Sequence, residues 1–325
     1  IASNEFYENY YGHKIDHLDI ILNHVHDFPK IYLLGDSTLD NKFWFSDSSN
    51  AVNGYEDILN PPVSKRDVSF CINEEIMERK LSPPFIAVNC AVEESTIGMR
   101  RCGLLDQDRF VRDNVRSNDI VVISIGGNDI AFRPTCCTIL NMLILLNCST
   151  TSTVESFSCG NPIPAADCCF LDTLFGCGPS CWSNCLSFPP GLGYFLHMFK
   201  ERTQDYASRV LTHTDNRPSK VAICMLYYLD KTPGNSWAEL ALRVLGYNRN
   251  PSHLQAVMRK VFELGTKKIT LDGTEFVPIP LFEALDGNDS RDYVERVEPS
   301  AIGGKKLAIF LLDKLLGSKD HDKGN

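Results

Sequence analysis

The sequence has no long hydrophobic run and no excess of basic residues. Its most apolar segment, residues 139–146, is eight residues long and includes Asn141, whereas a membrane-spanning helix needs about 20 residues. Lys and Arg number 32 against 41 Asp and Glu, a net charge of −9. We therefore expect no transmembrane segment and no nucleic-acid partner. Apolar residues make up 43% of the 325 residues, enough for the core of a folded protein.

Cysteine pairs with the CxxC spacing of zinc knuckles are absent, although the chain has 13 cysteines. Nine of them lie in residues 136–185, a segment that contains no Lys or Arg. This density predicts disulfide bonds within an insertion at about residues 136–189, and hence an oxidising compartment. A zinc cluster is the alternative. Because nine is odd, at least one of these cysteines is free or pairs elsewhere.

The chain begins with Ile1 rather than Met, which indicates that a leading segment has been removed, and a signal peptide and another segment explain this equally well. One further feature fits a secretory route. Glycosylation sequons occur at Asn147 and Asn288. We therefore expect a secreted or luminal glycoprotein. The cysteines outside the cluster are predicted to be buried core thiols: Cys71, Cys90, Cys102 and Cys224.

Short apolar runs alternate with helical patterns along the chain. The runs predict buried strands, and their alternation with helices predicts a parallel sheet covered on both faces. We expect one α/β domain over residues 1–325, a three-layer α/β/α sandwich with about five parallel strands. Pro278 indicates that the last strand is an edge or ends there. The predicted strands are residues 31–34, 85–88, 119–125, 221–226 and 275–279, and the predicted helices are residues 14–26, 72–81, 106–115, 192–211, 237–245, 252–264 and 302–316.

Polar residues follow two of the predicted strands and precede the last predicted helix. These segments are residues 35–41 (GDSTLDN), 126–129 (GGND) and 292–300 (DYVERVEPS). In open parallel sheets the ligand crevice lies at the carboxyl ends of the strands, which makes these segments candidates for a site. Each also has a structural interpretation: Asp36–Ser37 as a helix cap, GGND as a plain turn, and Ser300 as the cap of the last helix.

Taken together, the three segments resemble the SGNH, or GDSL-type, hydrolase family, over roughly residues 31–316. The resemblance implies a flavodoxin-like α/β/α fold, with Ser37 as the nucleophile. It implies an oxyanion hole made by Asn128 and by backbone amides of Ser37, Gly127 and the loop after the second strand. Esters of lipids and acylated sugars are typical substrates of the family, and no cofactor or metal is expected.

The sequence departs from the family pattern at two positions. Glu94 stands near the place of the glycine after the second strand, where its side chain is expected to crowd the site. Glu298 stands in place of the histidine base, and Glu295 in place of the acid three residues earlier. The last segment is similar to a divergent branch that reads Asp-Tyr, Glu-Pro-Ser and Gly-Gly.

A serine hydroxyl needs a base to accept its proton, and Glu298 is the candidate. An ordinary glutamate titrates near pH 4.3, which predicts an acid-shifted pH optimum, although burial or a neighbouring carboxylate raises the pKa. Asp292 or Glu295 is the predicted third member. Supporting roles are predicted for the neighbouring polar residues of the first and third segments: Asp36, Asp40, Asp129 and Arg133.

Three alternatives remain open. A histidine from elsewhere could be the base, with seven candidates at positions 13, 17, 24, 26, 197, 213 and 253. The fold could bind a small ligand without hydrolysing it. Asp36, Asp40, Asp292 and Glu298 could form a Ca²⁺ or Mg²⁺ site, because oxygen ligands suit these cations. Apolar residues of the cysteine-rich segment could line an acyl pocket or form that segment's own core: residues 139–146, Phe170, Leu171, Leu174, Phe175 and Trp182.

Overall fold

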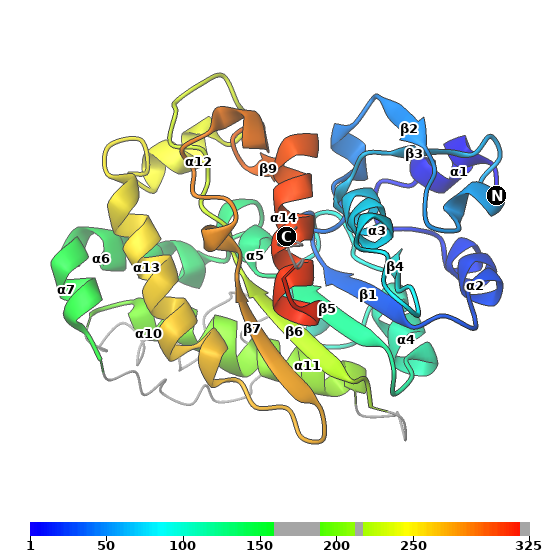
Figure 1. The fold of residues 1–325 in the computed structure, drawn as a ribbon. Coiled ribbons are helices and arrows are strands. Elements are labelled where there is room, and N and C mark those ends of the chain that lie inside the picture. Colours follow the sequence, from blue (N-terminus) through cyan, green and yellow to red (C-terminus); the bar gives the residue numbers. More distant parts are fainter. Residues whose placement is uncertain (159–188, 212–216, 319–325) are drawn as a thin grey trace, which may run out of the picture.

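A five-stranded parallel sheet forms the centre of the computed structural model, which describes residues 1–158, 189–211 and 217–318 (Figure 1). The strand order is β4-β1-β5-β6-β7, and every neighbouring pair is parallel. The predicted α/β/α sandwich is thereby confirmed, and β7 is an edge strand as Pro278 indicated. The strands are β1 (Lys30–Gly35), β4 (Ile86–Asn89), β5 (Ile120–Ser124), β6 (Lys220–Met225) and β7 (Glu275–Pro280).

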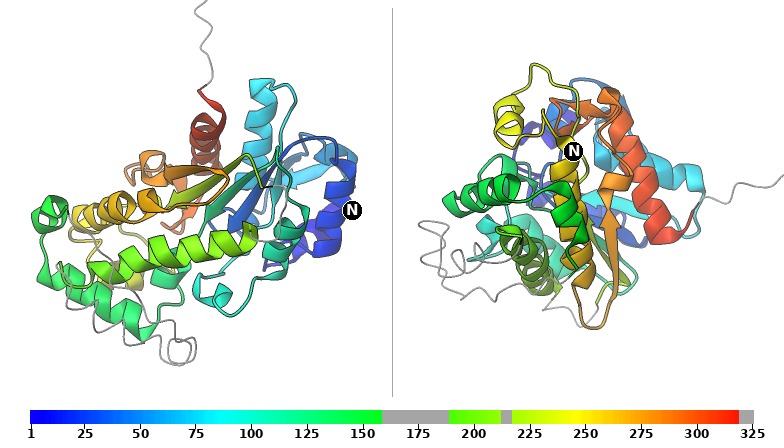
Figure 2. Two further views of the ribbon diagram at one scale, coloured as in Figure 1. Left: turned by 90° about the horizontal axis from the view of Figure 1, so that it is seen from below. Right: turned by 90° about the vertical axis from the view of Figure 1, so that its left-hand side faces the viewer.

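Successive side chains along a strand point to opposite faces of the sheet. Since apolar side chains lie on both faces, helices cover both. Ile31 and Leu33 pack against α3 (Val68–Arg79) and α14 (Ala301–Leu316). Tyr32 and Leu34 belong to the core on the other face. That face is covered by α2 (Ile15–His24), α4 (Asp106–Asn114), α10 (Leu192–His197), α11 (Thr203–Leu211) and α13 (Pro251–Leu264). Figure 2 shows helices on both faces of the sheet.

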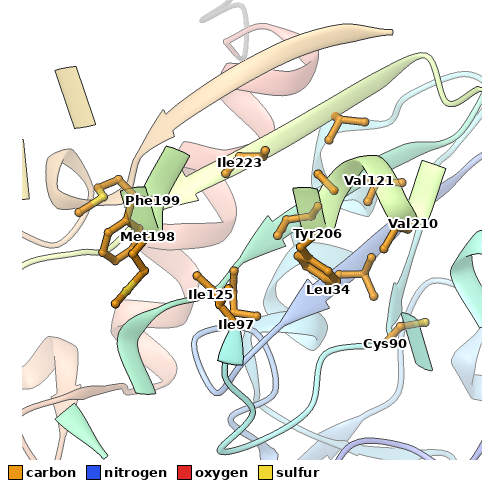
Figure 3. Close-up of a cluster of buried hydrophobic side chains, with 14 of the residues drawn as sticks. Leu34, Cys90, Ile97, Val121, Ile125, Met198, Phe199, Tyr206, Val210 and Ile223 are labelled. Atoms are coloured by element: carbon orange, nitrogen blue, oxygen red, sulfur yellow. The ribbon is translucent and has the colours of Figure 1, made fainter. Parts of the chain in front are cut away.

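The close-up in Figure 3 shows how this second core is built. Leu34, Val121 and Ile223 come from three adjacent strands, and they meet Tyr206 and Val210 of α11. All five side chains are at most 1% exposed. The sheet is therefore a rigid platform from which its carboxyl-end loops project.

Several elements were not predicted, because they are short or lack a clear hydrophobic period. A π-helical turn, Met198–Arg202, interrupts the helix predicted over residues 192–211. The additional helices are α1 (Ser3–Glu8), α5 (Gly127–Ala131), α6 (Cys136–Cys148) and α7 (Thr151–Ser156), and α12 is Glu239–Val244. Two small antiparallel pairs join β2 (Ser48–Asn50) to β3 (Val63–Lys65) and β8 (Tyr293–Val294) to β9 (Glu298–Pro299). Single 3₁₀ turns lie at Lys42–Trp44, Tyr55–Asp57, Gly98–Arg100, Thr266–Lys268, Leu281–Glu283 and Ser290–Asp292.

Helix α14 begins where the sequence predicted, and its start fixes the segment before it. The Ser300 hydroxyl accepts hydrogen bonds from the amides of Ile302 and Gly303, each at 3.2 Å, so the predicted cap is confirmed. A Cβ atom on Gly303 would lie 2.1 Å from the carbonyl oxygen of Asp292. Only glycine permits this approach, which holds residues 292–300 against the helix.

The cysteines outside the predicted insertion are free thiols, and three of the four are buried as predicted: Cys71, Cys90 and Cys224. Cys102 is exposed, which corrects the prediction, because it lies in a surface bend rather than in a strand or helix. Cys136 and Cys148, at the two ends of α6, are free and exposed. The disulfide framework stays a prediction, since six cysteines of the cluster lie outside the described residues: Cys159, Cys168, Cys169, Cys177, Cys181 and Cys185.

Candidate active site

Ser37 lies in a tight turn at the carboxyl end of β1. The turn needs Gly35, because its φ is +127° and a Cβ atom there would lie 1.7 Å from the Ser124 carbonyl oxygen. The carboxylate of Asp36 accepts a hydrogen bond from the Thr38 amide at 3.1 Å. No helix begins at this point, so Asp36 caps a turn and the interpretation as a helix cap is wrong.

Glu298 meets Ser37 across 261 positions of sequence. The Ser37 hydroxyl donates a hydrogen bond to Oε1 of Glu298 at 3.2 Å. Glu298 lies in β9, directly before the capped start of α14, and both side chains are buried. Oε2 of Glu298 is also buried and has no hydrogen-bond partner among the described residues. The structure thus brings together the nucleophile and base that the sequence predicts.

Burial makes Glu298 a stronger base than an ordinary glutamate. Removal from water raises the pKa of Glu298 well above 4.5, and the charge of Asp36 raises it further, whereas the Ser37 hydrogen bond opposes the shift. The pKa of Asp36 is itself raised to about 6, mainly by burial. If Glu298 is the base, the raised pKa moves the expected pH optimum to a higher pH than an ordinary glutamate would give.

A third buried acid, Glu93, was not predicted. It lies in the loop after β4, and its side chain is only 3% exposed. Burial raises the pKa of Glu93 strongly, and the charge of Glu298 is the next largest cause. The charge of Glu298 therefore disfavours the ionised form of Glu93.

The predicted third members of the site have partners elsewhere. Oδ2 of Asp292 accepts a hydrogen bond from the ammonium of Lys306 at 2.7 Å. Glu295 accepts a hydrogen bond from the Trp237 amide at 3.2 Å. Among the described residues, neither acid is hydrogen-bonded to Glu298. After burial, the charge of Asp36 is the next largest cause that raises the pKa of Glu298.

Two of the oxyanion-hole candidates share a pocket with Ser37. Asn128 and Gly127, in the first turn of α5, line the same pocket as Ser37. Nδ2 of Asn128 donates one hydrogen bond to the Ser95 carbonyl at 3.2 Å. Since an amide nitrogen has two N–H groups, the second remains for a substrate oxygen.

Glu94 keeps the backbone conformation that glycine favours, with a φ of +58°. Its carboxylate accepts hydrogen bonds from the Tyr10 hydroxyl and from Arg133, each at 2.9 Å. Neither Glu94 nor Arg133 lines the pocket beside Ser37, so the expected crowding by the Glu94 side chain is not seen there. The backbone amide of Glu94 remains a candidate donor.

Other residues of the predicted motifs tie the loops together. Asp129 accepts hydrogen bonds from the amides of Ile97 and Gly98, at 2.8 and 3.1 Å, and so joins α5 to the loop after β4. Nδ2 of Asn41 donates to the Pro299 carbonyl at 2.9 Å, which links the serine loop to the Glu298 segment.

Asp40 is a structural carboxylate rather than a metal ligand. Oδ1 of Asp40 accepts a hydrogen bond from the Lys42 ammonium at 2.6 Å, and Oδ2 accepts from the amides of Gly12 and Glu93. Asp292 is likewise paired with a lysine. No cluster of three His, Cys, Asp or Glu side chains suited to a metal ion occurs in the part of the chain that the structure describes. The four carboxylates of the metal alternative are thus not assembled into one site.

Arg100 is a further residue that the sequence motifs did not reveal. It is fully buried, and its guanidinium donates to the Gly35 carbonyl at 3.2 Å and to the Ser95 hydroxyl at 2.9 Å. Asp108 balances its charge with a carboxylate oxygen 2.9 Å away. Arg100 therefore fixes the β1 turn against the loop after β4.

None of the histidines among the described residues supplies a base near Ser37. None of those described lines its pocket, and His213 lies outside the described residues. His13 stacks on Phe6, and burial lowers its pKa. His253 contacts the Ser149 hydroxyl at 3.4 Å. Glu298 is therefore the base that the geometry favours.

An apolar pocket of about 110 Å³ opens beside Ser37, Asn128 and Glu298. Its other walls come from β6, α10, α12 and α13 and from Met142 of α6. Of the predicted apolar segment 139–146, only Met142 lines it, whereas Ile139, Leu140 and Leu143 are exposed. The other predicted apolar residues, Phe170, Leu171, Leu174, Phe175 and Trp182, lie outside the described residues.

No helix of residues 1–158, 189–211 and 217–318 has the length and hydrophobicity to cross a bilayer.

The sequence matches no protein-family model and no curated protein. Similar solved structures include an extracellular lipase from Streptomyces rimosus, 15% identical, covering 88% of this chain and 98% of that chain, with a TM-score of 0.42. An acetyl xylan esterase from Geobacillus stearothermophilus is 12% identical, covers 89% and 95%, and has a TM-score of 0.43. A candidate GDSL-like lipase from Parabacteroides merdae is 14% identical, covers 88% and 94%, and has a TM-score of 0.40. These low identities and TM-scores carry no argument about function, so the function is inferred from the geometry of the site.

Replacing Asp36 with asparagine is expected to lower the pH at which Glu298 ionises by about one unit. The substitution removes the negative charge that raises the pKa of Glu298, and it keeps the oxygen that binds the Thr38 amide. The measurement is the rate of Ser37 modification against pH, with exposed Asp47→Asn as the control. An unchanged midpoint would show that Asp36 does not act on Glu298.

Proposed function

We propose that this protein is a serine esterase of the SGNH type, in which Ser37 attacks a carboxylic ester and Glu298 is the base. The hydrogen bond from the Ser37 hydroxyl to Glu298, at 3.2 Å beside an apolar pocket, carries the proposal. A Ser–Glu pair at the carboxyl edge of a parallel sheet is the arrangement expected of acyl-transfer chemistry.

The first half of the reaction forms an acyl-enzyme. Glu298 accepts the hydroxyl proton as Oγ of Ser37 bonds to the ester carbon. The carbonyl oxygen becomes an oxyanion, for which Nδ2 of Asn128 and the amides of Ser37 and the Glu94 loop are the candidate donors. Glu298 then returns the proton to the departing alcohol as the ester C–O bond breaks.

The second half releases the acid. Water attacks the acyl-enzyme, Glu298 accepts its proton, and Ser37 leaves with that proton while the carboxylic acid departs. An alcohol in place of water would give acyl transfer by the same steps. The raised pKa of Glu298 supports this role, because a stronger base accepts the serine proton more readily.

Reaction with a fluorophosphonate, followed by intact mass at several pH values from about 4 to about 9, tests the nucleophile. We expect one adduct in the wild type and in Ser48→Ala, an exposed-serine control, and none in Ser37→Ala. The serine oxygen bonds to phosphorus and fluoride leaves. An adduct that persists in Ser37→Ala, or no adduct at any pH, would contradict the proposal and favour a protein that binds a ligand without hydrolysis.

A further inference from the structure

The pocket beside Ser37 changes from polar to apolar along its length. At the polar end, a Cβ atom on Gly127 would lie 3.8 Å from Oδ2 of Asp36 and 3.5 Å from Leu226. Leu226 and Tyr227 directly follow β6, so the apolar wall begins next to the catalytic groups. One side of a substrate whose ester carbon reaches Ser37 therefore faces this wall.

One face of α13 forms the long wall of the pocket. Leu254, Val257, Met258 and Val261 all line it, and they are spaced as i, i+3, i+4 and i+7 on one side of the helix. Seven residues of helix span about 10 Å, which is the extended length of an acyl chain of about eight carbons.

Helix α12 and the residue before it form another wall of this pocket. Ala238, Ala241 and Leu242 line it, and the small alanine side chains leave space that larger residues would fill. Figure 1 shows α12 and α13 on the same side of the molecule as α6 and α10. The pocket extends to Met142 of α6, whose side chain is only 3% exposed.

Among the described residues that line the pocket, the charged side chains are Asp36 and Glu298, both beside Ser37. A hydroxylated or charged group placed among the other walls would lose its hydrogen bonds to water without replacement. Methylene groups gain from the same transfer. The pocket chemistry thus favours a hydrocarbon chain over a sugar.

We propose that this pocket binds the acyl chain, and that the substrate is an ester of a fatty acid of about eight carbons. This inference rests on the proposed esterase function, because it assigns the acyl side of the ester to the pocket. The alcohol part of the substrate stays outside, on the open side of Ser37.

The test compares kcat/KM for p-nitrophenyl acetate, butyrate, octanoate and laurate. Each buried methylene is expected to raise kcat/KM about threefold, so octanoate should exceed acetate by about 10²-fold or more. Val257→Phe fills the pocket and should lower the octanoate-to-acetate ratio at least about tenfold. Leu240→Phe, on the exposed face of α12, is the matched control and should keep the ratio. Acetate as the best substrate, or an unchanged ratio in Val257→Phe, would overturn the inference.

A binding measurement separates the acyl pocket from catalysis. Trp237 lines the pocket, so octanoate should change the tryptophan fluorescence of Ser37→Ala saturably, whereas acetate should not, and Trp237→Phe should remove the change. Binding of octanoate without hydrolysis of any ester would contradict the proposed esterase function but support the assignment of the pocket to an acyl chain. If acetate esters are hydrolysed without dependence on chain length and octanoate does not bind, the acyl pocket fails alone.

Discussion

Replacement of Glu298 by glutamine is expected to lower kcat/KM for ester hydrolysis by about 10²- to 10⁴-fold. Glutamine keeps the shape of the side chain and can still accept a hydrogen bond from the Ser37 hydroxyl. It cannot take the serine proton, so the nucleophile stays a neutral hydroxyl. Glu295→Gln is the matched control, because Glu295 is hydrogen-bonded to the Trp237 amide and not to Ser37. We expect that variant to stay within about threefold of the wild type.

The pH profile of the wild type gives an independent check of the same role. Glu298 must be ionised to act as a base, so the rate rises with pH through its pKa. Burial and Asp36 raise that pKa, and the midpoint of the rise should lie well above pH 4.5, the ordinary glutamate value. A rate already maximal at about pH 5, or a loss of less than threefold in Glu298→Gln, would show that another group is the base.

The glutamine variant is not expected to unfold the protein, which keeps the kinetic result interpretable. Glu298 is buried, and one of its oxygens has no hydrogen-bond partner in the described part of the chain. Replacing an acid that resists ionisation by a neutral amide removes a destabilising charge at high pH. Thermal unfolding of Glu298→Gln should therefore occur at the wild-type temperature or above it. A large drop in that temperature would point to a structural role instead.

All five sheet strands could be predicted from the sequence because each is a short apolar run, and a buried parallel strand needs nothing more specific. β5 (Ile120–Ser124) is the clearest case, with β-branched residues throughout its centre. Helix α6 was missed because its hydrophobicity is not confined to one face and its segment was interpreted by its cysteines. The prediction of disulfides and of an oxidising compartment depends on residues of that insertion and stays a prediction.

The candidate site was predictable only as far as its motifs are local. Ser37 and Asn128 follow strands directly, so their place at the sheet edge follows from the sequence. Local sequence patterns could not predict the roles of three residues, because each contacts a segment tens to hundreds of residues away in the sequence: Asn41, Glu93 and Arg100. A signal was available for Asn41, since it lies next to the predicted Asp40 in the GDSTLDN segment that was already a candidate.

The predicted third members have other hydrogen-bond partners in the structure. Asp292 accepts from Lys306, and Glu295 accepts from the Trp237 amide. Their segment folds back on itself as an antiparallel pair, β8 with β9, and Glu295 takes a left-handed conformation, with a φ of +52°. The family pattern, from which Glu295 was predicted, does not reveal this local fold.

Breaking the buried Asp40–Lys42 ion pair is the second change with a large expected effect. Asp40 is 0% exposed and Lys42 is 1% exposed, and the ammonium lies 2.6 Å from Oδ1 of the carboxylate. Asp40→Asn leaves a lysine ammonium in the core without its counter-charge. Removing one partner of such a pair costs about 3–5 kcal/mol of folding free energy.

The expected loss extends to the site, because Oδ2 of Asp40 also accepts the Gly12 and Glu93 amides, at 3.1 and 2.9 Å. Urea unfolding of Asp40→Asn, Lys42→Met and the double variant measures the coupling between the two side chains. We expect each single variant to lose more stability than a surface substitution does, and the double variant to lose less than the sum of the two. Strictly additive losses, or a loss below about 0.5 kcal/mol in Asp40→Asn, would mean that the pair does not hold the serine loop against the loop after β4.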